Sequence, residues 1–230
     1  MVKVKSKITA LKAVKNPRVQ RSGIFVDGKF AFSLDNEVIL KEQLKVGQAL
    51  SPKEVDMLTK ADHFQSCLNA AFRFLSFRPR SEAETRQRLR LRGYADEEIE
   101  RVISRLKQLE LLDDATFAQF WKENRSSFRP RSRTMLKVEL RRKGVESEVI
   151  NEAIEDIDDA ENAYKAAIAR ARTLPVADYQ IFRKKLGGYL QRRGFNYGVI
   201  NSTVKRAWQE QTGSFEQHPD PTEEVDAADN

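Results

Sequence analysis

The pentapeptide FRPRS occupies residues 77–81 and recurs unchanged at residues 128–132, 51 positions later. The flanks keep this phase through a leucine followed four residues later by a glycine, at Leu89–Gly93, Leu140–Gly144 and, 50 residues further on, Leu190–Gly194. A fixed period indicates that each unit is one supersecondary element stacked on its neighbours. The sequence therefore predicts a helical repeat array, a class of protein that works mainly through an extended surface.

Each repeat is predicted to contain three helices. In the first repeat, Ser81 and Glu84 have the spacing of a capping box for a second helix that ends at Gly93. A third helix begins after Asp96, with apolar residues at core spacing. In the second repeat, Ser147 is expected to cap the corresponding third helix.

Residues 8–34 follow a β pattern instead. Short apolar runs at 24–26 and 30–34 flank Asp27-Gly28, a strong hairpin signal. A short helix near 36–43 completes the predicted module. Ser51-Pro52-Lys53-Glu54 then marks the start of a long helix that leads into the first repeat.

The predicted fold is therefore mainly α, with three tandem three-helix repeats and a small β-containing N-terminal module. The segments expected are this module at 1–50, a linking helix with repeat one at 51–111, repeat two at 112–157, repeat three at 158–212 and an acidic, disordered tail at 213–230.

Charge is unevenly distributed along the 230 residues. The formal net charge is +7, but the tail holds six acids and no Lys or Arg, so residues 1–212 carry +13. A body this basic indicates a polyanionic partner, either nucleic acid or a very acidic protein surface. The tail is interpreted either as an autoinhibitory competitor for that partner or as a solubilising segment.

Other sequence features bear on membrane insertion, secretion and the redox state of the compartment. No apolar run approaches about 18 residues, so no membrane span is expected. The basic N-terminus lacks the features of a signal peptide. A single cysteine, Cys67, fits a reducing cytoplasm and the role of a small core residue.

Basic residues recur at matched phases in the three repeats, and Arg92, Lys143 and Arg193 are in register. Stacked repeats would align such residues in a basic stripe, and arginine favours bidentate contact with phosphates or carboxylates. The alternative is an ordinary solvated helix face. The candidate binding residues are Arg78, Arg80, Arg86, Arg90, Arg92, Arg129, Arg131, Arg133, Lys137, Arg141, Arg142, Lys143, Arg183, Lys184, Arg192 and Arg193.

Catalytic and metal sites find little support in the sequence. Asp113-Asp114 could bind a metal, but such a site needs a second cluster of ligands, and the histidines are only His63 and His218. Capping of a helix is the favoured interpretation of these aspartates. No phosphate-binding glycine loop and no nucleophile–base set is present, so neither enzymatic activity nor a cofactor is expected.

Aromatic residues could serve as stacking platforms for nucleic-acid bases. Most of them lie at helical spacing with aliphatic residues, which favours core packing for nearly all of the set Phe117, Phe120, Trp121, Phe128, Tyr189, Phe195 and Trp208.

Four segments, in order and spacing, resemble the RecX family of regulators of the RecA recombinase. They are RPRSE at 78–82 with the region up to Gly93-Tyr94, LLDDATFA at 111–118, ELRRKGV at 139–145 and LQRRGF at 190–195. The β-containing module and the acidic tail lie outside these motifs, and Ser132 lacks a Glu three residues later.

The resemblance implies a curved, elongated molecule that lies in the groove of the RecA–single-stranded-DNA filament. It implies inhibition of ATPase, strand exchange and coprotease functions, in DNA repair, homologous recombination and the SOS response. The expected partner of this cytoplasmic monomer is the filament, with single- or double-stranded DNA as a further ligand. Two alternatives remain open: a direct DNA- or RNA-binding protein, because three-helix units also build helix-turn-helix readers, and a scaffold for an acidic protein.

Overall fold

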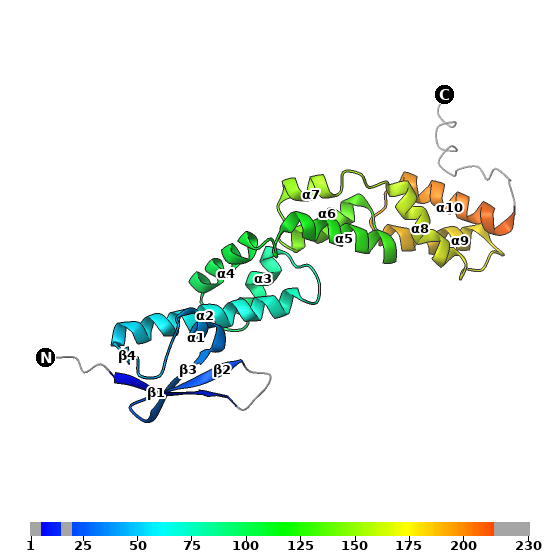
Figure 1. The fold of residues 1–230 in the computed structure, drawn as a ribbon. Helices are drawn as coiled ribbons and strands as arrows, with labels where there is room; N and C mark the ends of the chain where they lie inside the picture. The colour runs from blue at the N-terminus through cyan, green and yellow to red at the C-terminus, as the bar shows by residue number, and fades with distance from the viewer. Residues whose placement is uncertain (1–5, 15–19, 214–230) are drawn as a thin grey trace. The chain divides into compact units, whose positions relative to one another are not determined.

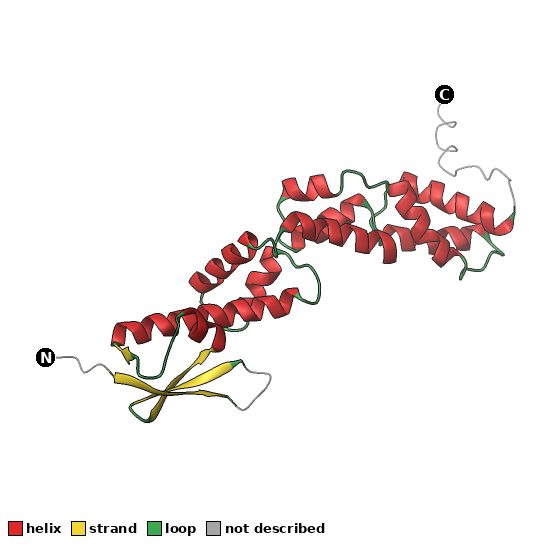
Figure 2. Cartoon of the chain, viewed as in Figure 1, coloured by secondary structure: helices red, strands yellow, loops and turns green. Residues whose placement is uncertain are grey.

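The structure is a computed structural model that describes residues 6–14 and 20–213. Two compact units divide the chain, Met1–Asp114 and Ala115–Asn230. Within the described residues there are four strands and ten helices (Figures 1 and 2). Of the tail predicted to be disordered, residues 213–230, Gly213 ends α10 and residues 214–230 lie outside the described part.

The first unit opens with a four-stranded antiparallel sheet of order β3-β2-β1-β4. Asp27 and Gly28 both have positive φ, 48° and 79°, as a tight turn between two strands requires. The predicted hairpin is thus confirmed, and the short helix after it is α1. The bounds are β1 Ser6–Ala13, β2 Arg21–Val26, β3 Lys29–Asp35, α1 Asn36–Lys41 and β4 Ala49–Leu50.

Nine further helices form three successive groups of three in the described residues. Ser51 and Glu54 form the predicted capping box at the start of α2. A fold that is mainly α, with three three-helix repeats and a β-containing module, is confirmed. The helices are α2 Pro52–Leu75, α3 Glu82–Arg90 and α4 Asp96–Gln108 in repeat one, α5 Asp114–Phe128, α6 Arg133–Arg142 and α7 Ser147–Ala153 in repeat two, and α8 Asp159–Ala171, α9 Tyr179–Gln191 and α10 Tyr197–Thr212 in repeat three.

Each repeat has an apolar core of its own. The in-phase leucines of the second helices, Leu89, Leu140 and Leu190, are all fully buried. The in-phase glycines that follow have φ between 79° and 86°, the left-handed region in which glycine ends a helix without strain. The predicted cap at Ser147 is wrong by one residue, because Ser147 is already helical and Glu146 holds the cap position.

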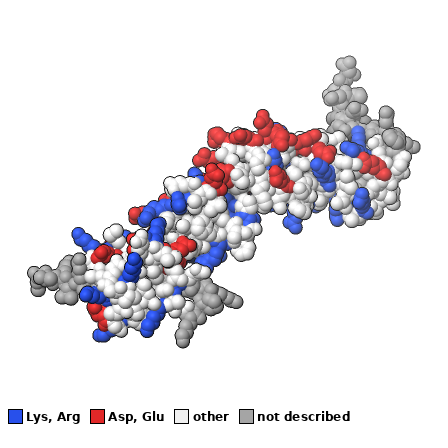
Figure 3. All heavy atoms as spheres, viewed as in Figure 1, with Lys and Arg blue, Asp and Glu red and all other residues white. Residues whose placement is uncertain are grey.

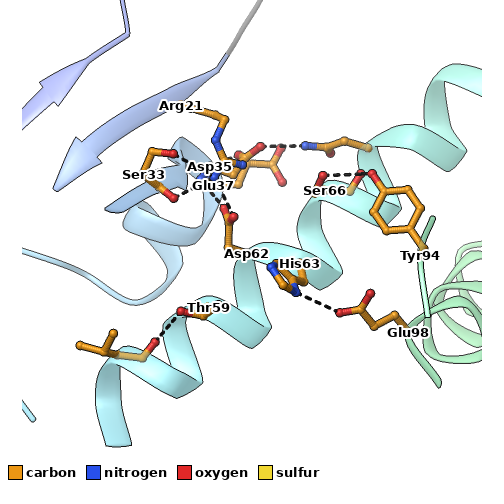
Figure 4. Close-up of polar contacts among 12 residues, drawn as sticks. Arg21, Ser33, Asp35, Glu37, Thr59, Asp62, His63, Ser66, Tyr94 and Glu98 are labelled. Atoms are coloured by element: carbon orange, nitrogen blue, oxygen red, sulfur yellow. Dashed lines mark hydrogen bonds and ion pairs between the residues drawn. The ribbon is translucent and has the colours of Figure 1, made fainter. Parts of the chain in front are cut away.

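In the first unit, α2 lies between the sheet on one side and α3 and α4 on the other (Figure 1). Its contact with the sheet includes a largely buried network that we call the polar seam: Arg21, Asp35, Asp62, Gln65 and Asn69. Figure 4 labels Arg21, Asp35 and Asp62 of this network. Asp62 accepts hydrogen bonds from Arg21 Nη2 and from the Asp35 amide, both at 2.7 Å. Because buried carboxylates require such partners, the seam fixes the module on α2.

Candidate basic surface

The fold itself uses several of the predicted binding residues. In repeat one, the ring of Phe74 lies 4.2 Å from the Arg80 guanidinium, whose pKa is lowered by burial and then by neighbouring Arg78. Other side chains form ion pairs that hold adjacent segments together. These pairs are Arg78–Glu84 at 3.0 Å, Arg90–Asp96 at 2.6 Å and Arg131–Glu139 at 3.0 Å.

Two basic residues at one repeat phase connect the second helix of a repeat to its third helix. Arg86 Nε donates to Glu100 Oε1 at 2.8 Å, which raises the pKa of Arg86 and lowers that of Glu100. Lys137 Nζ donates to Asn151 Oδ1 at 2.7 Å. Both pairs span 14 residues. We call them the struts of repeats one and two.

Arg133 and Arg193 contact neighbouring backbone within the second unit. Arg133 Nη2 donates to the carbonyl oxygens of Glu155 and Ile157. Arg193 Nη1 donates to the Pro130 carbonyl at 3.0 Å, and its guanidinium lies over the ring of Tyr189 in α9. These residues join repeat two to the elements that follow it.

Other predicted residues are exposed and make no side-chain hydrogen bond or ion pair with the residues that the structure describes. We call them the free cations: Arg92, Arg129, Arg141, Arg142, Lys184 and Arg192. Of the three residues in register, Arg92 is in this set, whereas Lys143 lies over the Trp121 ring and Arg193 bonds to backbone. The free cations are therefore the predicted residues available to a ligand without breaking internal contacts.

The exposure of two phenylalanines was not predicted from the sequence. Phe77 and Phe128 occupy the same place in the repeated pentapeptide and are 83% and 78% exposed. The prediction of core packing is wrong for Phe128, although Phe117 and Phe195 are buried as expected. The recurrence of the phenylalanine in both motifs, where no core contact uses it, was the available signal.

An acidic edge was also missed. Between Lys143 and Lys165 the sequence holds no Lys or Arg. The acidic residues of this stretch belong to α7 and the segments around it, and Figure 3 shows acidic atoms gathered along one edge of the second unit. They are Glu146, Glu148, Glu152, Glu155, Asp156, Asp158, Asp159 and Glu161. Its charge disfavours a polyanion on this side.

Aspartates at the starts of α5 and α8 bind helix N-termini, but Asp114 binds the start of another helix, whereas the sequence predicts that of α5. Asp158 accepts from the first amides of α8. Asp114 instead accepts from the Glu82 amide at 2.8 Å, at the start of α3, and Asp159 accepts from the Arg133 amide at 2.6 Å, at the start of α6. Burial, above all, raises the pKa of Asp114.

Features of the described residues bear on metal binding and on side-chain reactivity. Residues 6–14 and 20–213 contain no group of three or more His, Cys, Asp and Glu side chains placed to hold a metal ion. Burial raises the pKa of the Cys67 thiol to about 12, so it is uncharged and unreactive at neutral pH. In the same residues, no helix is both long and apolar enough to cross a membrane.

Four family models match the chain in sequence order. They are described as the regulatory protein RecX N-terminal domain, at residues 6–51, and the first, second and third three-helix domains of RecX, at 67–106, 113–154 and 156–204.

Individual relatives agree with these models. A regulatory protein RecX of Clostridium perfringens (strain SM101 / Type A) is 30% identical over 205 residues, or 87% of this chain and 95% of its own length. One of Listeria monocytogenes serotype 4b (strain F2365) is 30% identical over 207 residues, or 89% of this chain and 77% of its own. A crystal structure of regulatory protein RecX has a similar fold, with a TM-score of 0.66 at 23% identity over 87% of this chain and 99% of that one.

Proposed function

The chain belongs to the RecX family of regulatory proteins, and we propose that it binds the RecA–single-stranded-DNA filament and inhibits its ATPase, strand-exchange and coprotease activities without catalysis of its own. The observation that carries this proposal is the match of four RecX domains, in order, along residues 6–204. The charge of the body supports the same type of partner, because a filament with bound DNA is a polyanion.

The proposed contact surface consists of the free cations. Their guanidinium and ammonium groups already lie in solvent, so binding phosphate or carboxylate costs no internal ion pair. In the second unit we place the contact away from the acidic edge, since like charges there would repel the ligand. Arg141 and Arg142, at the end of α6, are the adjacent pair best suited to a phosphate backbone.

The test is the DNA-dependent ATPase of RecA from the same cell. Substoichiometric amounts of the protein are expected to lower the rate of ATP hydrolysis and to shorten filaments seen by electron microscopy. The double variant Arg141→Gln/Arg142→Gln should inhibit less, whereas Glu148→Gln/Glu152→Gln on the acidic edge should inhibit at least as well. Unchanged hydrolysis and filament length at every ratio would refute the proposal.

A second candidate function is direct binding of single-stranded nucleic acid. It is favoured by Phe128, exposed beside the free cation Arg129, because aromatic rings stack on bases while cations contact phosphates. Fluorescence anisotropy with an oligonucleotide separates the two functions. Affinity that rises sharply when RecA and ATP are added supports filament recognition, and equal affinity for bare DNA supports the second candidate.

A further inference from the structure

Repeat three carries a surface hollow of about 450 Å³ between α9 and the start of α10. Gly187 and Gly188 form part of its α9 side, and Tyr197 and Asn201 part of its α10 side. The volume lies in the range of pockets that hold small ligands. The other second helices, α3 and α6, have a side chain in the corresponding place.

The hollow lies where repeats one and two have their struts. The strut residues Arg86 and Lys137 correspond in phase to Gly187, and their partners Glu100 and Asn151 correspond to Asn201, at the same separation of 14 residues. Repeat three thus keeps an amide partner but has lost the long side chain that would reach it. The missing strut leaves this part of the groove between α9 and α10 open.

Packing does not require the two glycines. A Cβ at Gly187 would lie 3.5 Å from Ile200 Cγ2, and one at Gly188 would lie 3.5 Å from Arg192 Nη1, both ordinary van der Waals contacts. Neither residue has positive φ. Because glycine weakens a helix interior, an alanine would fit and stabilise α9. Since neither packing nor backbone conformation requires glycine here, the effect of this glycine pair is to keep the hollow open.

The lining has the chemistry of a nucleotide site. It contains the cations Arg183 and Lys184 and no Asp or Glu. Arg183 Nη2 donates to the hydroxyl of Tyr197 at 3.1 Å, which positions a ring that is still 58% exposed. The side-chain amides of Gln180, Gln191 and Asn201 add donors and acceptors of the kind that contact base edges.

We propose that this hollow binds one nucleotide of single-stranded DNA, with the cations on its phosphate and Tyr197 against its base. The proposal rests on the proposed function, because it names where the protein would touch the DNA of the filament. An acidic peptide would use the cations but would leave the aromatic ring and the amides without a role, so a nucleotide fits the whole lining better.

The test restores the strut. Gly187→Lys places in repeat three the residue that repeat two has at this phase and should fill the hollow. Gly198→Lys is the matched control, since it adds the same charge in α10 at an exposed glycine outside the lining. Binding of fluorescein-labelled oligothymidylate to the full chain is measured by anisotropy without RecA, and thermal melting checks the fold of both variants.

Gly187→Lys should weaken binding roughly tenfold, although it adds a positive charge, because one stacked base is lost. Gly198→Lys should bind as tightly as wild type or slightly more tightly. An undiminished affinity of Gly187→Lys, or a wild type that does not bind oligothymidylate, overturns the proposal. If Gly187→Lys loses affinity for the filament but not for bare DNA, the hollow binds protein and the nucleotide assignment is wrong. The RecA ATPase of the wild type is independent of these outcomes, so the two proposals fail separately.

Discussion

The second helices of repeats one and two, α3 and α6, differ from α9 of repeat three on the side that faces the third helix. All three bury an in-phase leucine completely. On α3 and α6 a long basic side chain crosses to the third helix, whereas α9 has Gly187 at that phase and a hollow beside it. At this phase the second helix is joined to the third in two repeats and not in repeat three, where Arg183, one turn earlier, bonds to Tyr197 instead.

Their N-termini differ as well. Ser81 and Ser132 cap α3 and α6. The next amide of α3 donates to Asp114, and the next amide of α6 donates to Asp159 of repeat three. The start of α6 is therefore bound by an aspartate of repeat three, whereas the start of α9 is bound by its own Asp178.

The largest expected effect tests what the three helices share. Leu140→Ala and Leu190→Ala should each lower the free energy of unfolding by about 2–5 kcal/mol, because each leaves a cavity in a filled core. Urea denaturation measures both. Leu91→Ala, at a side chain that is 76% exposed, is the control and should change stability by less than about 0.5 kcal/mol. A small loss at Leu190 alone would mean that repeat three is not packed like repeat two.

The next effect tests the stacking of repeat three on repeat two. Gly93 and Gly194 both have φ near 85°, so alanine at either costs about 1–2 kcal/mol of left-handed strain. A Cβ at Gly194 would also lie 2.7 Å from Ser132 Oγ and 2.9 Å from Met135 Cβ, whereas nothing lies within 4 Å at Gly93. Gly194→Ala should therefore lose roughly 1–3 kcal/mol more than Gly93→Ala in chemical denaturation. Equal losses would contradict the close contact between these repeats.

The repeat phase, the glycine ends and the hairpin could be predicted because they depend on local sequence. Leu89, Leu140 and Leu190 recur at a fixed period, and glycine is the residue that most readily ends a helix in the left-handed region. The repeat period, together with capping residues and glycine ends, therefore predicted the three-helix repeats.

The partner of each polar side chain could not be predicted in this way. Arg86 resembles other exposed arginines in sequence, yet Glu100 on another helix makes it a strut. Asp62 and Asp35, 27 residues apart, meet in the polar seam only after the sheet has packed on α2. Which acid pairs with which base depends on the three-dimensional packing. The division of the predicted stripe into struts and free cations therefore came from the structure.

A binding measurement tests whether the free cations, and not the struts, contact phosphate. Arg141→Gln/Arg142→Gln should reduce the slope of log K against log salt for filament binding by about 2 units, because each lost phosphate contact contributes about one. Thermal stability should be unchanged, since neither side chain has a partner among the described residues. Lys137→Gln breaks a strut and should instead lower stability slightly and leave the salt slope almost unaltered. A reversed outcome would assign phosphate contact to the struts.

The smallest effect concerns Asp114, whose carboxylate accepts from the Glu82 amide at the start of α3. Burial raises the pKa of Asp114, so between the unfolded and folded pKa values the folded chain holds more protons. The contribution of this carboxyl to stability is therefore greatest below the unfolded pKa and falls as pH rises through the folded one. Asp114→Asn keeps an oxygen acceptor for the Glu82 amide without the buried charge. It should match or exceed wild type in stability at pH 7, and the difference should vanish at low pH.

Asp114→Ala, which removes the acceptor as well, should lose about 1 kcal/mol. Asp178→Ala supplies the comparison on α9, where Asp178 caps its own helix from an exposed position and the loss should be similar. Thermal melts of these three variants between pH 3 and 8 give the required differences. If Asp114→Asn is as unstable at pH 7 as Asp114→Ala, the charge of Asp114 stabilises the start of α3, and its burial does not outweigh its attraction to the helix N-terminus.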